Sequence, residues 1–222
     1  MPLKRAVLPL LDHTERLATE VGAANTVVFA AGRRHGHNTD VPGLIAALAA
    51  HGVTAASLPP GAEVLILGAG ATACSALAAA RGLGLTEVTV AARDHARAGD
   101  LLAAGGRLGM IIHLTGYDRL AGHPELVIST VPAGAADSVA ERIAQGALRP
   151  RFLLDVVYHP WPTRLALAAS AAGAAVAGGF DLLLHQAAGQ VELMTGQPAP
   201  LAAMRAAGQA ALAARRPGVR NT

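Results

Sequence analysis

Glycine and alanine follow a short apolar run in EVLILGAGATA, residues 63–73. Gly68 permits a sharp turn, Gly70 lets a phosphate approach the backbone, and Ala73 is small enough for a helix to pack on its strand. The free N–H groups at the start of that helix attract a pyrophosphate. The apolar run before the turn and the Ala-rich run after it favour a dinucleotide-binding turn over an ordinary Gly-rich one. The predicted cofactor-binding residues here are Gly68, Ala69, Gly70, Ala71, Thr72 and Ala73.

Two arginines follow the next apolar run, where an acidic residue would bind the ribose hydroxyls of NAD. Arg93 stands at that position and Arg97 lies one turn further on. A guanidinium can hold a 2′-phosphate with two parallel hydrogen bonds, so NADP is the predicted cofactor and NAD remains possible. Asp94 could pair with both arginines or accept from a free 2′-hydroxyl. The alternative is that both arginines are solvated residues at a helix start.

Lys4 is the only lysine in the chain, since every other basic residue is arginine. A lysine ammonium is a compact charge that can donate a proton, which makes Lys4 a candidate catalytic group. A single lysine can also arise by chance in an arginine-rich sequence.

Asp40 ends the segment Asn38-Thr39-Asp40, at the junction between a predicted hairpin and a predicted helix. A carboxylate there can cap the helix. It can also join the amides of Asn25 and Asn38 in binding a hydroxylated ligand. The residues alone leave both interpretations open.

Other reactive residue types form no recognisable site. His35 and His37 alternate on the predicted hairpin, but no third ligand has a useful spacing, so we expect surface histidines and no metal. Cys74 is the only cysteine, so the chain cannot form an intrachain disulfide, which suits a cytoplasmic protein. We expect Cys74 to be a small buried residue.

The elements that must position these residues alternate regularly after SLPPG, residues 57–61, which has the composition of a linker. The predicted strands are 64–67, 87–92, 110–114, 126–130, 152–156 and 174–177. The first predicted helix follows the Gly-rich turn and ends near residue 82. The other predicted helices cover 96–104, 136–144 and 163–172. This alternation predicts an α/β fold with a Rossmann-type doubly wound parallel sheet and right-handed crossovers.

The segments on either side of this unit have helical and hairpin patterns. Residues 5–21 suggest one helix interrupted near Asp12, and residues 25–38 suggest a β-hairpin. A helix follows, with Thr39 or Asp40 as its cap and a stop at Gly52. Two further helices are expected at 182–194 and 200–214.

The composition excludes several classes of protein. Hydrophobic residues make up 52% of the 222-residue chain and charged residues 15%, so we expect a folded protein. A net charge of +3 and 3% aromatic residues argue against a nucleic-acid partner. The longest apolar tract, 165–180, is too short to span a bilayer, and the N-terminus lacks a signal-peptide pattern, so we expect no membrane partner.

Several segments together resemble the shikimate dehydrogenase family, and they extend over nearly the whole chain. In order they are PLK (2–4), GAANTV (22–27), GHNTD (36–40), GAGATA (68–73), ARDHARA (92–98), STVP (129–132), DVVYHPWPT (155–163) and GFDLLLHQA (179–187). The combination of NTD with the VYxPxxT and GxxxLLxQA segments is far more specific than the Gly-rich turn.

The resemblance implies reversible, NADP-linked reduction of 3-dehydroshikimate to shikimate. Lys4 would donate a proton to the developing alkoxide, and Asp40 would hold Lys4 and a substrate hydroxyl. The implied substrate-binding residues are Asn25, Tyr158 and Gln186. The implied cofactor-binding residues outside the Gly-rich turn are Arg93, Arg97, Val131 and Gly179. The partner would be a small molecule, and the protein a monomer or homodimer.

The sequence departs from the family pattern in three places. Residues 92–94 lack the family's Asn and Thr, which weakens the expectation of strict NADP preference. Residues 129–132 replace NATP with STVP and so lose a hydroxyl near the cofactor. Family members also begin with a βα segment carrying a Ser-x-Ser pair for the substrate carboxylate, and none precedes PLK here. The sequence leaves open whether Met1 corresponds to an internal codon taken for a start, in which case strands of the substrate-binding domain would be missing from this chain.

These considerations predict the division of the chain. We expect a partial α/β substrate-binding domain at 1–50, an NADP-binding domain at 51–181, C-terminal helices at 182–215 that pack back toward the first domain, and a tail at 216–222. Two alternatives to the dehydrogenase remain: a quinate/shikimate-type enzyme with relaxed cofactor use, and a non-catalytic nucleotide-binding fragment.

Overall fold

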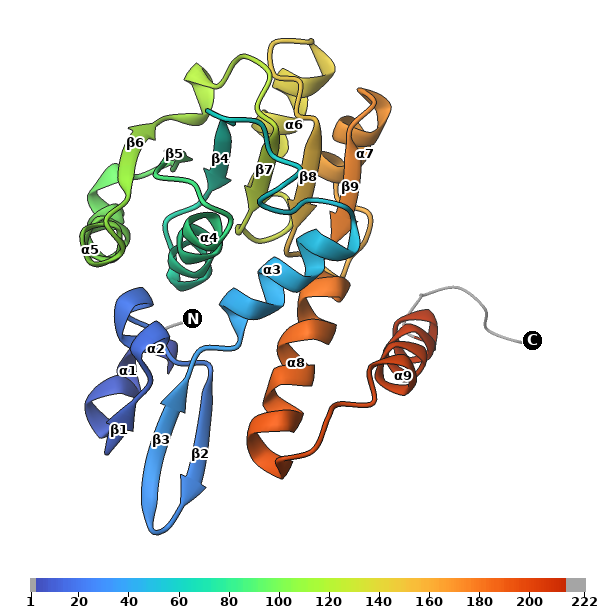
Figure 1. Ribbon diagram of the computed structural model, residues 1–222. Helices are drawn as coiled ribbons and strands as arrows, with labels where there is room; N and C mark the ends of the chain where they lie inside the picture. Colours follow the sequence, from blue (N-terminus) through green and yellow to red (C-terminus); the bar gives the residue numbers. More distant parts are fainter. Residues whose placement is uncertain (1–2, 215–222) are drawn as a thin grey trace.

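A computed structural model describes residues 3–214 of the chain, and Figure 1 shows two separate sheets, with helices packed against the larger one. The larger sheet has six strands and the smaller has three. The larger sheet contains β4 (Val64–Leu67), β5 (Glu87–Ala91), β6 (Ile111–Thr115), β7 (Leu126–Ser129), β8 (Phe152–Asp155) and β9 (Ala175–Gly178). Each predicted strand is confirmed to within about one residue at its ends.

The six strands are all parallel and lie in the order β6-β5-β4-β7-β8-β9. The chain therefore moves outward from β4 in one direction and then from β7 in the other. This confirms the predicted doubly wound sheet, and its reversal point lies between β4 and β7. Loops that leave the carboxyl ends of these two strands must flank a crevice at that edge.

Helices cover both faces of this sheet, which explains its continuous apolar strands. The crossover helices are α4 (Ala71–Gly82), α5 (Gly99–Leu108), α6 (Asp137–Ala144) and α7 (Arg164–Ala171). Along β4, Val64 and Ile66 join the core under α4, while Leu65 and Leu67 join the core under α6 and α7. Alternate side chains of one strand thus fill two separate cores.

The N-terminal part builds the smaller sheet. It contains α1 (Leu3–Ala6), the 3₁₀ helix η1 (Leu8–Leu10), β1 (His13–Thr14), α2 (Arg16–Val21), β2 (Thr26–Ala30) and β3 (Arg33–His37). β2 and β3 form the predicted antiparallel hairpin, which projects away from the large sheet in Figure 1. β1 pairs with β3 in parallel.

The predicted interruption of residues 5–21 near Asp12 is present, but the chain continues there as a short strand, β1, before helix α2. Residues 13 and 14 form a strand because Asp12 turns the chain along β3. Its carboxylate accepts from the Arg34 backbone N–H at 2.8 Å and from the guanidinium at 2.9 Å. These hydrogen bonds hold the pKa of Asp12 well below its usual range. A partner 22 residues away therefore decides the local structure.

Helix α3 (Asp40–Ala50) begins where predicted, but its cap differs. Among the described residues, neither Thr39 nor Asp40 supplies a side-chain cap. The Oδ1 of Asn38 accepts from the Val41 N–H at 3.2 Å instead. The Asp40 carboxylate is thereby left for other contacts.

The α-helix predicted over 96–104 begins later than expected. Asp94 Oδ1 accepts from the Ala96 N–H at 3.0 Å and caps a 3₁₀ helix, η2 (His95–Ala98), before α5 begins at Gly99. Another 3₁₀ helix, η3 (Tyr117–Arg119), follows β6.

Two long helices, α8 (Gly179–Thr195) and α9 (Leu201–Ala214), complete the described chain. α8 starts three residues earlier than predicted and packs closely on α3, as Figure 1 shows. A side chain at Gly43 of α3 would lie 2.9 Å from the Gln186 backbone N of α8. The expected tail at 216–222 lies outside the described residues, and the domain boundaries remain predictions.

Within residues 3–214, no helix combines the length and apolar character needed to cross a bilayer. The same residues contain no group of three or more His, Cys, Asp or Glu side chains placed to bind a metal ion.

Candidate active site

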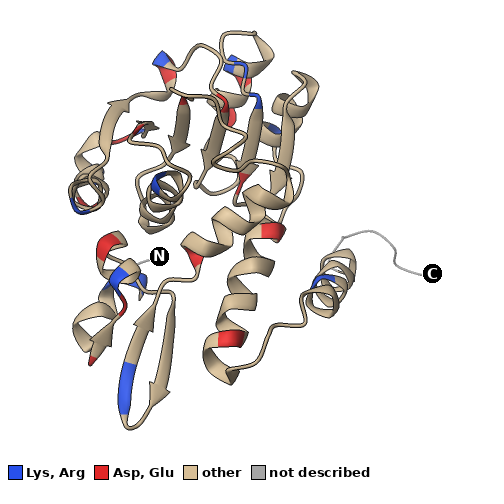
Figure 2. Ribbon diagram, viewed as in Figure 1, with Lys and Arg blue, Asp and Glu red and all other residues tan. Residues whose placement is uncertain are grey.

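Lys4 of α1 and Asp40 of α3 form an ion pair through Nζ and Oδ2. Figure 2 shows the acidic start of α3 opposite the basic residues of α1. The Asp40 side chain is 2% exposed and that of Lys4 is 21% exposed. A buried carboxylate therefore fixes an ammonium that still reaches the surface. The structure thus brings the two catalytic candidates together.

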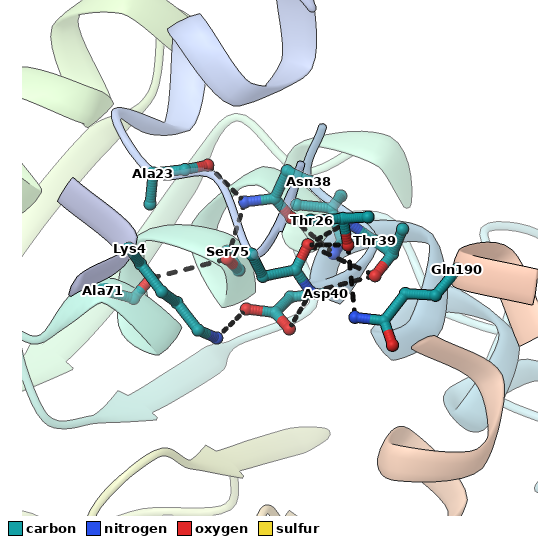
Figure 3. A network of polar contacts seen from close by, with 11 residues as sticks. Lys4, Ala23, Thr26, Asn38, Thr39, Asp40, Ala71, Ser75 and Gln190 are labelled. Atoms are coloured by element: carbon teal, nitrogen blue, oxygen red, sulfur yellow. Dashed lines mark hydrogen bonds and ion pairs between the residues drawn. The ribbon is translucent and has the colours of Figure 1, made fainter. Parts of the chain in front are cut away.

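Asn25 holds the other oxygen of this carboxylate, whose contact with Lys4 can be followed in Figure 3. Its Nδ2 donates to Asp40 Oδ1 at 2.8 Å and to Thr39 Oγ1 at 2.9 Å, and its Oδ1 accepts from the Thr39 N–H at 2.8 Å. The adjacent Ala24 N–H donates to the Lys4 carbonyl oxygen at 2.8 Å. The segment just before β2, which supplies Asn25, therefore positions both members of the ion pair.

Of the two amides expected to converge with Asp40 on a ligand, only Asn25 contacts the Asp40 carboxylate. Asn38 is buried and donates to the Ala23 carbonyl at 2.9 Å and to Ser75 Oγ at 3.5 Å. Together with its bond to Val41, these contacts give Asn38 a structural role. It ties the start of α3 to α4, which begins at the Gly-rich turn.

Gln190 belongs to the same network and was not predicted. Its Nε2 donates to Thr26 Oγ1 at 3.2 Å, and that hydroxyl donates to Asn25 Oδ1 at 3.1 Å. Gln190 lies four residues after Gln186, on the same side of α8. That helical spacing is the sequence signal that could have identified it.

The other two predicted substrate residues lie in different surroundings. The backbone of Gln186 faces Gly43 of the helix that begins at Asp40. Tyr158 follows β8 and lines a cavity of about 420 Å³ with Trp161, Phe180 and Leu212. The structure therefore places Gln186 beside α3 and Tyr158 at the carboxyl edge of the large sheet.

A larger cavity of about 1040 Å³ lies at the point where the sheet reverses. Seven of the predicted cofactor residues line it: Gly68, Ala69, Gly70, Ala71, Arg93, Arg97 and Val131. Thr72 and Ala73 follow on the first turn of α4, and Ala73 is fully buried beneath it. The Gly-rich turn and the arginine segment, more than twenty residues apart in sequence, thus share one cavity.

The two glycines of the turn meet different constraints. Gly68 has φ +105°, and a Cβ there would lie 2.7 Å from Thr130 Oγ1. Gly70 has an extended backbone that any residue adopts, and no atom of the described chain lies within 4 Å of a Cβ built on it. The protein itself therefore requires glycine at 68, whereas the open space at 70 fits a group that approaches from the cavity.

Arg93 and Arg97 are exposed on the cavity wall, with Asp94 between them. Because Asp94 caps η2, its carboxylate is partly engaged with the backbone. Tyr117 lines the same cavity, and burial raises the pKa of its hydroxyl while the charge of Arg93 opposes that shift. This part of the wall therefore offers the guanidinium groups of Arg93 and Arg97 and a neutral phenol, and Arg5 lines the cavity as well.

Gly179 does not line this cavity, and its environment explains why glycine stands there. A Cβ at this position would overlap the Val156 carbonyl oxygen and lie 2.9 Å from the Val157 carbonyl carbon. The Gly179 N–H donates to the Val157 oxygen at 3.2 Å. Close backbone packing is therefore sufficient to require glycine, and the predicted approach to the nicotinamide stays a prediction.

The loop that carries Tyr158 is held by a buried carboxylate. Asp155 Oδ2 accepts from Thr163 Oγ1 at 2.7 Å, and Oδ1 accepts from the Val157 N–H at 3.2 Å. Burial raises the pKa of Asp155, and these hydrogen bonds oppose the shift. The Asp and Thr of the DVVYHPWPT segment therefore fix both ends of the loop.

Comparison with known proteins gives consistent matches. Residues 179–207 match the family described as shikimate 5′-dehydrogenase C-terminal domain. The NADP(+) shikimate dehydrogenase of Halobacterium salinarum is 36% identical over 90% of this chain and 73% of its own length.

Two solved structures extend the likeness to three dimensions. The shikimate dehydrogenase of Mycobacterium tuberculosis has a TM-score of 0.79 at 38% identity, covering 95% of this chain and 76% of that one. The Thermus thermophilus enzyme, solved with NADP(H) and shikimate, has a TM-score of 0.78 at 30% identity, covering 95% and 77%. The chain belongs to the shikimate dehydrogenase family.

Proposed function

We propose that this protein catalyses the reversible, NADP-linked reduction of 3-dehydroshikimate to shikimate. The observation that carries the proposal is the Lys4–Asp40 ion pair, in a chain whose Gly-rich turn and two arginines line one cavity. The family's named NADP(+) enzymes and the liganded Thermus structure support this choice of reaction and cofactor.

The chain's own residues supply the proton and the orientation. Lys4 donates a proton to the carbonyl oxygen of the substrate as negative charge develops there. Asp40 holds the ammonium in place, and Asn25 holds Asp40. Bound NADPH supplies the hydride. Because the Asp40 carboxylate is buried and hydrogen-bonded on both oxygens, it keeps Lys4 in position without the help of solvent.

The cofactor is held by backbone and side chains of the large cavity. The N–H groups at the start of α4 would face its pyrophosphate, and Gly70 leaves room for it. Arg93 and Arg97 would bind the 2′-phosphate, and Val131 would contact the cofactor from the loop after β7. Gly179 would approach the nicotinamide. On the substrate side, Asn25, Gln186 and Tyr158 bind hydroxyl or carboxylate groups.

We also propose that the partners are small molecules alone, with neither nucleic acid nor membrane involved. The protein would act in the cytoplasm as a monomer or homodimer.

A four-way rate comparison tests the proposed function. Initial rates are measured with shikimate or quinate as substrate and with NADP or NAD as cofactor. We expect shikimate with NADP to give the highest kcat/KM. A higher kcat/KM for quinate would refute the substrate assignment, and a preference for NAD would refute the cofactor assignment.

Gly70→Ala should weaken cofactor binding without destabilising the fold. The new methyl group enters open space in the free protein, so the free energy of unfolding should change by no more than about 0.5 kcal/mol. Overpacking against a bound phosphate should weaken NADPH binding about tenfold or more. Calorimetric titration and urea unfolding measure the two quantities. Unchanged NADPH affinity would show that no phosphate approaches Gly70.

Arg93→Gln should weaken NADPH binding about tenfold and leave NADH binding nearly unchanged, because a charged hydrogen bond to the 2′-phosphate is lost. Arg81→Gln is the matched control, since Arg81 is an exposed arginine in the last turn of α4. Dissociation constants from nicotinamide fluorescence compare the variants. Equal losses for NADPH and NADH would place Arg93 away from the 2′-phosphate.

A further inference from the structure

Arg5 follows Lys4 in α1, and its side chain turns toward the large sheet's helices. Its Nη1 forms an ion pair with Asp100 Oδ2 in the first turn of α5. Its Nη2 donates to Cys74 Sγ of α4 at 3.6 Å. Neighbouring residues of one short helix thus make different contacts: Lys4 with the catalytic carboxylate, and Arg5 with the helices beside the Gly-rich turn.

Arg5 and Asp100 both line the large cavity, together with Gly70, Ala71 and Arg97. The Asp100 side chain is 63% exposed and that of Arg5 is 32% exposed. A carboxylate on this wall repels the phosphates of a dinucleotide, and the guanidinium of Arg5 offsets that charge. The polarity of the wall therefore depends on what Arg5 contacts.

The strengths of the possible contacts indicate which one Arg5 prefers. An exposed ion pair contributes little, because solvent screens it and both side chains lose freedom. A guanidinium and a phosphate can form two parallel charge-assisted hydrogen bonds, which are stronger. Exchange of Asp100 for a phosphate oxygen is therefore favourable when a phosphate enters the cavity.

We propose that Arg5 is a phosphate ligand of the cofactor and that Asp100 holds it in the cofactor-free protein and competes with the phosphate. This inference rests on the proposed NADP-linked function and adds a cofactor contact from α1, outside the Rossmann-type unit. The phosphate is either the pyrophosphate, next to Gly70 and Ala71, or the 2′-phosphate, next to Arg97.

Opposite effects of two variants test the proposal. Arg5→Gln should weaken cofactor binding about tenfold, because a charged hydrogen bond is lost. Asp100→Asn should tighten it about two- to fivefold, because the competing carboxylate is removed. Dissociation constants for NADPH and NADH are measured by calorimetric titration, so the result does not depend on turnover.

The Arg16–Glu20 ion pair supplies matched controls. It joins an arginine to a carboxylate in the same N-terminal segment, at 2.7 Å, and lies outside the cavity. Arg16→Gln and Glu20→Gln should leave both dissociation constants unchanged. They change the net charge as the test variants do, and so reveal any general electrostatic effect.

The outcomes separate the possibilities. Weakening of NADPH alone by Arg5→Gln identifies the 2′-phosphate, and equal weakening of NADPH and NADH identifies the pyrophosphate. Two results would overturn the proposal. In the first, Arg5→Gln has the same cofactor dissociation constants as the control Arg16→Gln. In the second, Asp100→Asn weakens cofactor binding as Arg5→Gln does. In the second case the intact ion pair, rather than a free guanidinium, supports the site. If the native chain binds neither cofactor, the proposed function fails as well.

Discussion

Lys4→Met should lower kcat for 3-dehydroshikimate reduction by about a hundredfold to ten-thousandfold and leave the NADPH dissociation constant unchanged. The variant keeps most of the side-chain volume but lacks the proton that the ammonium donates to the substrate oxygen. Lys4 pairs with Asp40 and is not among the residues that line the large cavity, so cofactor binding should not depend on it. Stopped-flow absorbance and calorimetric titration measure the two quantities.

Lys4→Arg tests whether Lys4 acts by donating a proton or only by carrying the positive charge that pairs with Asp40. A guanidinium can keep the ion pair with Asp40 but is a poor proton donor, because it stays charged. We expect this variant to lose nearly as much kcat as Lys4→Met while unfolding at the native temperature. A parallel loss of turnover and cofactor affinity in Lys4→Met would instead mean that Lys4 is structural.

Gly179→Ala should destabilise the protein by about 3 kcal/mol, which corresponds to a fall in Tm of about 6 to 12 °C. The added methyl group overlaps the Val156 carbonyl oxygen at the junction of β9 and α8. Relief of the overlap requires the backbone of the loop that carries Tyr158 to shift. Thermal unfolding followed by circular dichroism gives the change.

Gly189→Ala provides the comparison in the same helix. A Cβ there would lie 3.4 Å from Thr39 Cγ2, an ordinary contact, and alanine favours a helix interior. We expect its Tm to stay level or rise slightly. If Gly179→Ala were equally stable, the close backbone packing would not be what requires glycine at this position.

The large sheet could be predicted because its signals are local. Strands buried on both faces need unbroken apolar runs, and β4, β7 and β8 are such runs with a turn or helical pattern after each. The strand at residues 13 and 14 could not be predicted, because the contacts that form it are not local. The two residues of β1 become a strand only through pairing with β3, and Asp12 finds its partner at Arg34.

The residues of the candidate site also fall into those with a local sequence signal and those placed only by contacts across the fold. The Gly-rich turn and Arg93 could be placed because each directly follows a strand of a parallel sheet. Lys4 and Asp40 were separate candidates, and only the fold showed that 36 residues of separation end in an ion pair. Arg5 carried no distinctive local pattern, since its role depends on a contact with α5. Gln190 shares the helical spacing of Gln186, but only the fold shows its contact with Thr26 of β2.

The central claim is that this chain transfers a hydride from NADPH to 3-dehydroshikimate while Lys4 supplies the proton. The most direct measurement is to incubate the protein with 3-dehydroshikimate and NADPH that carries deuterium at both hydrogen positions of nicotinamide C4, and to analyse the product by mass spectrometry and NMR. We predict shikimate with deuterium on the former carbonyl carbon. Bound NADPH that is not consumed, or shikimate without the label, would contradict the claim.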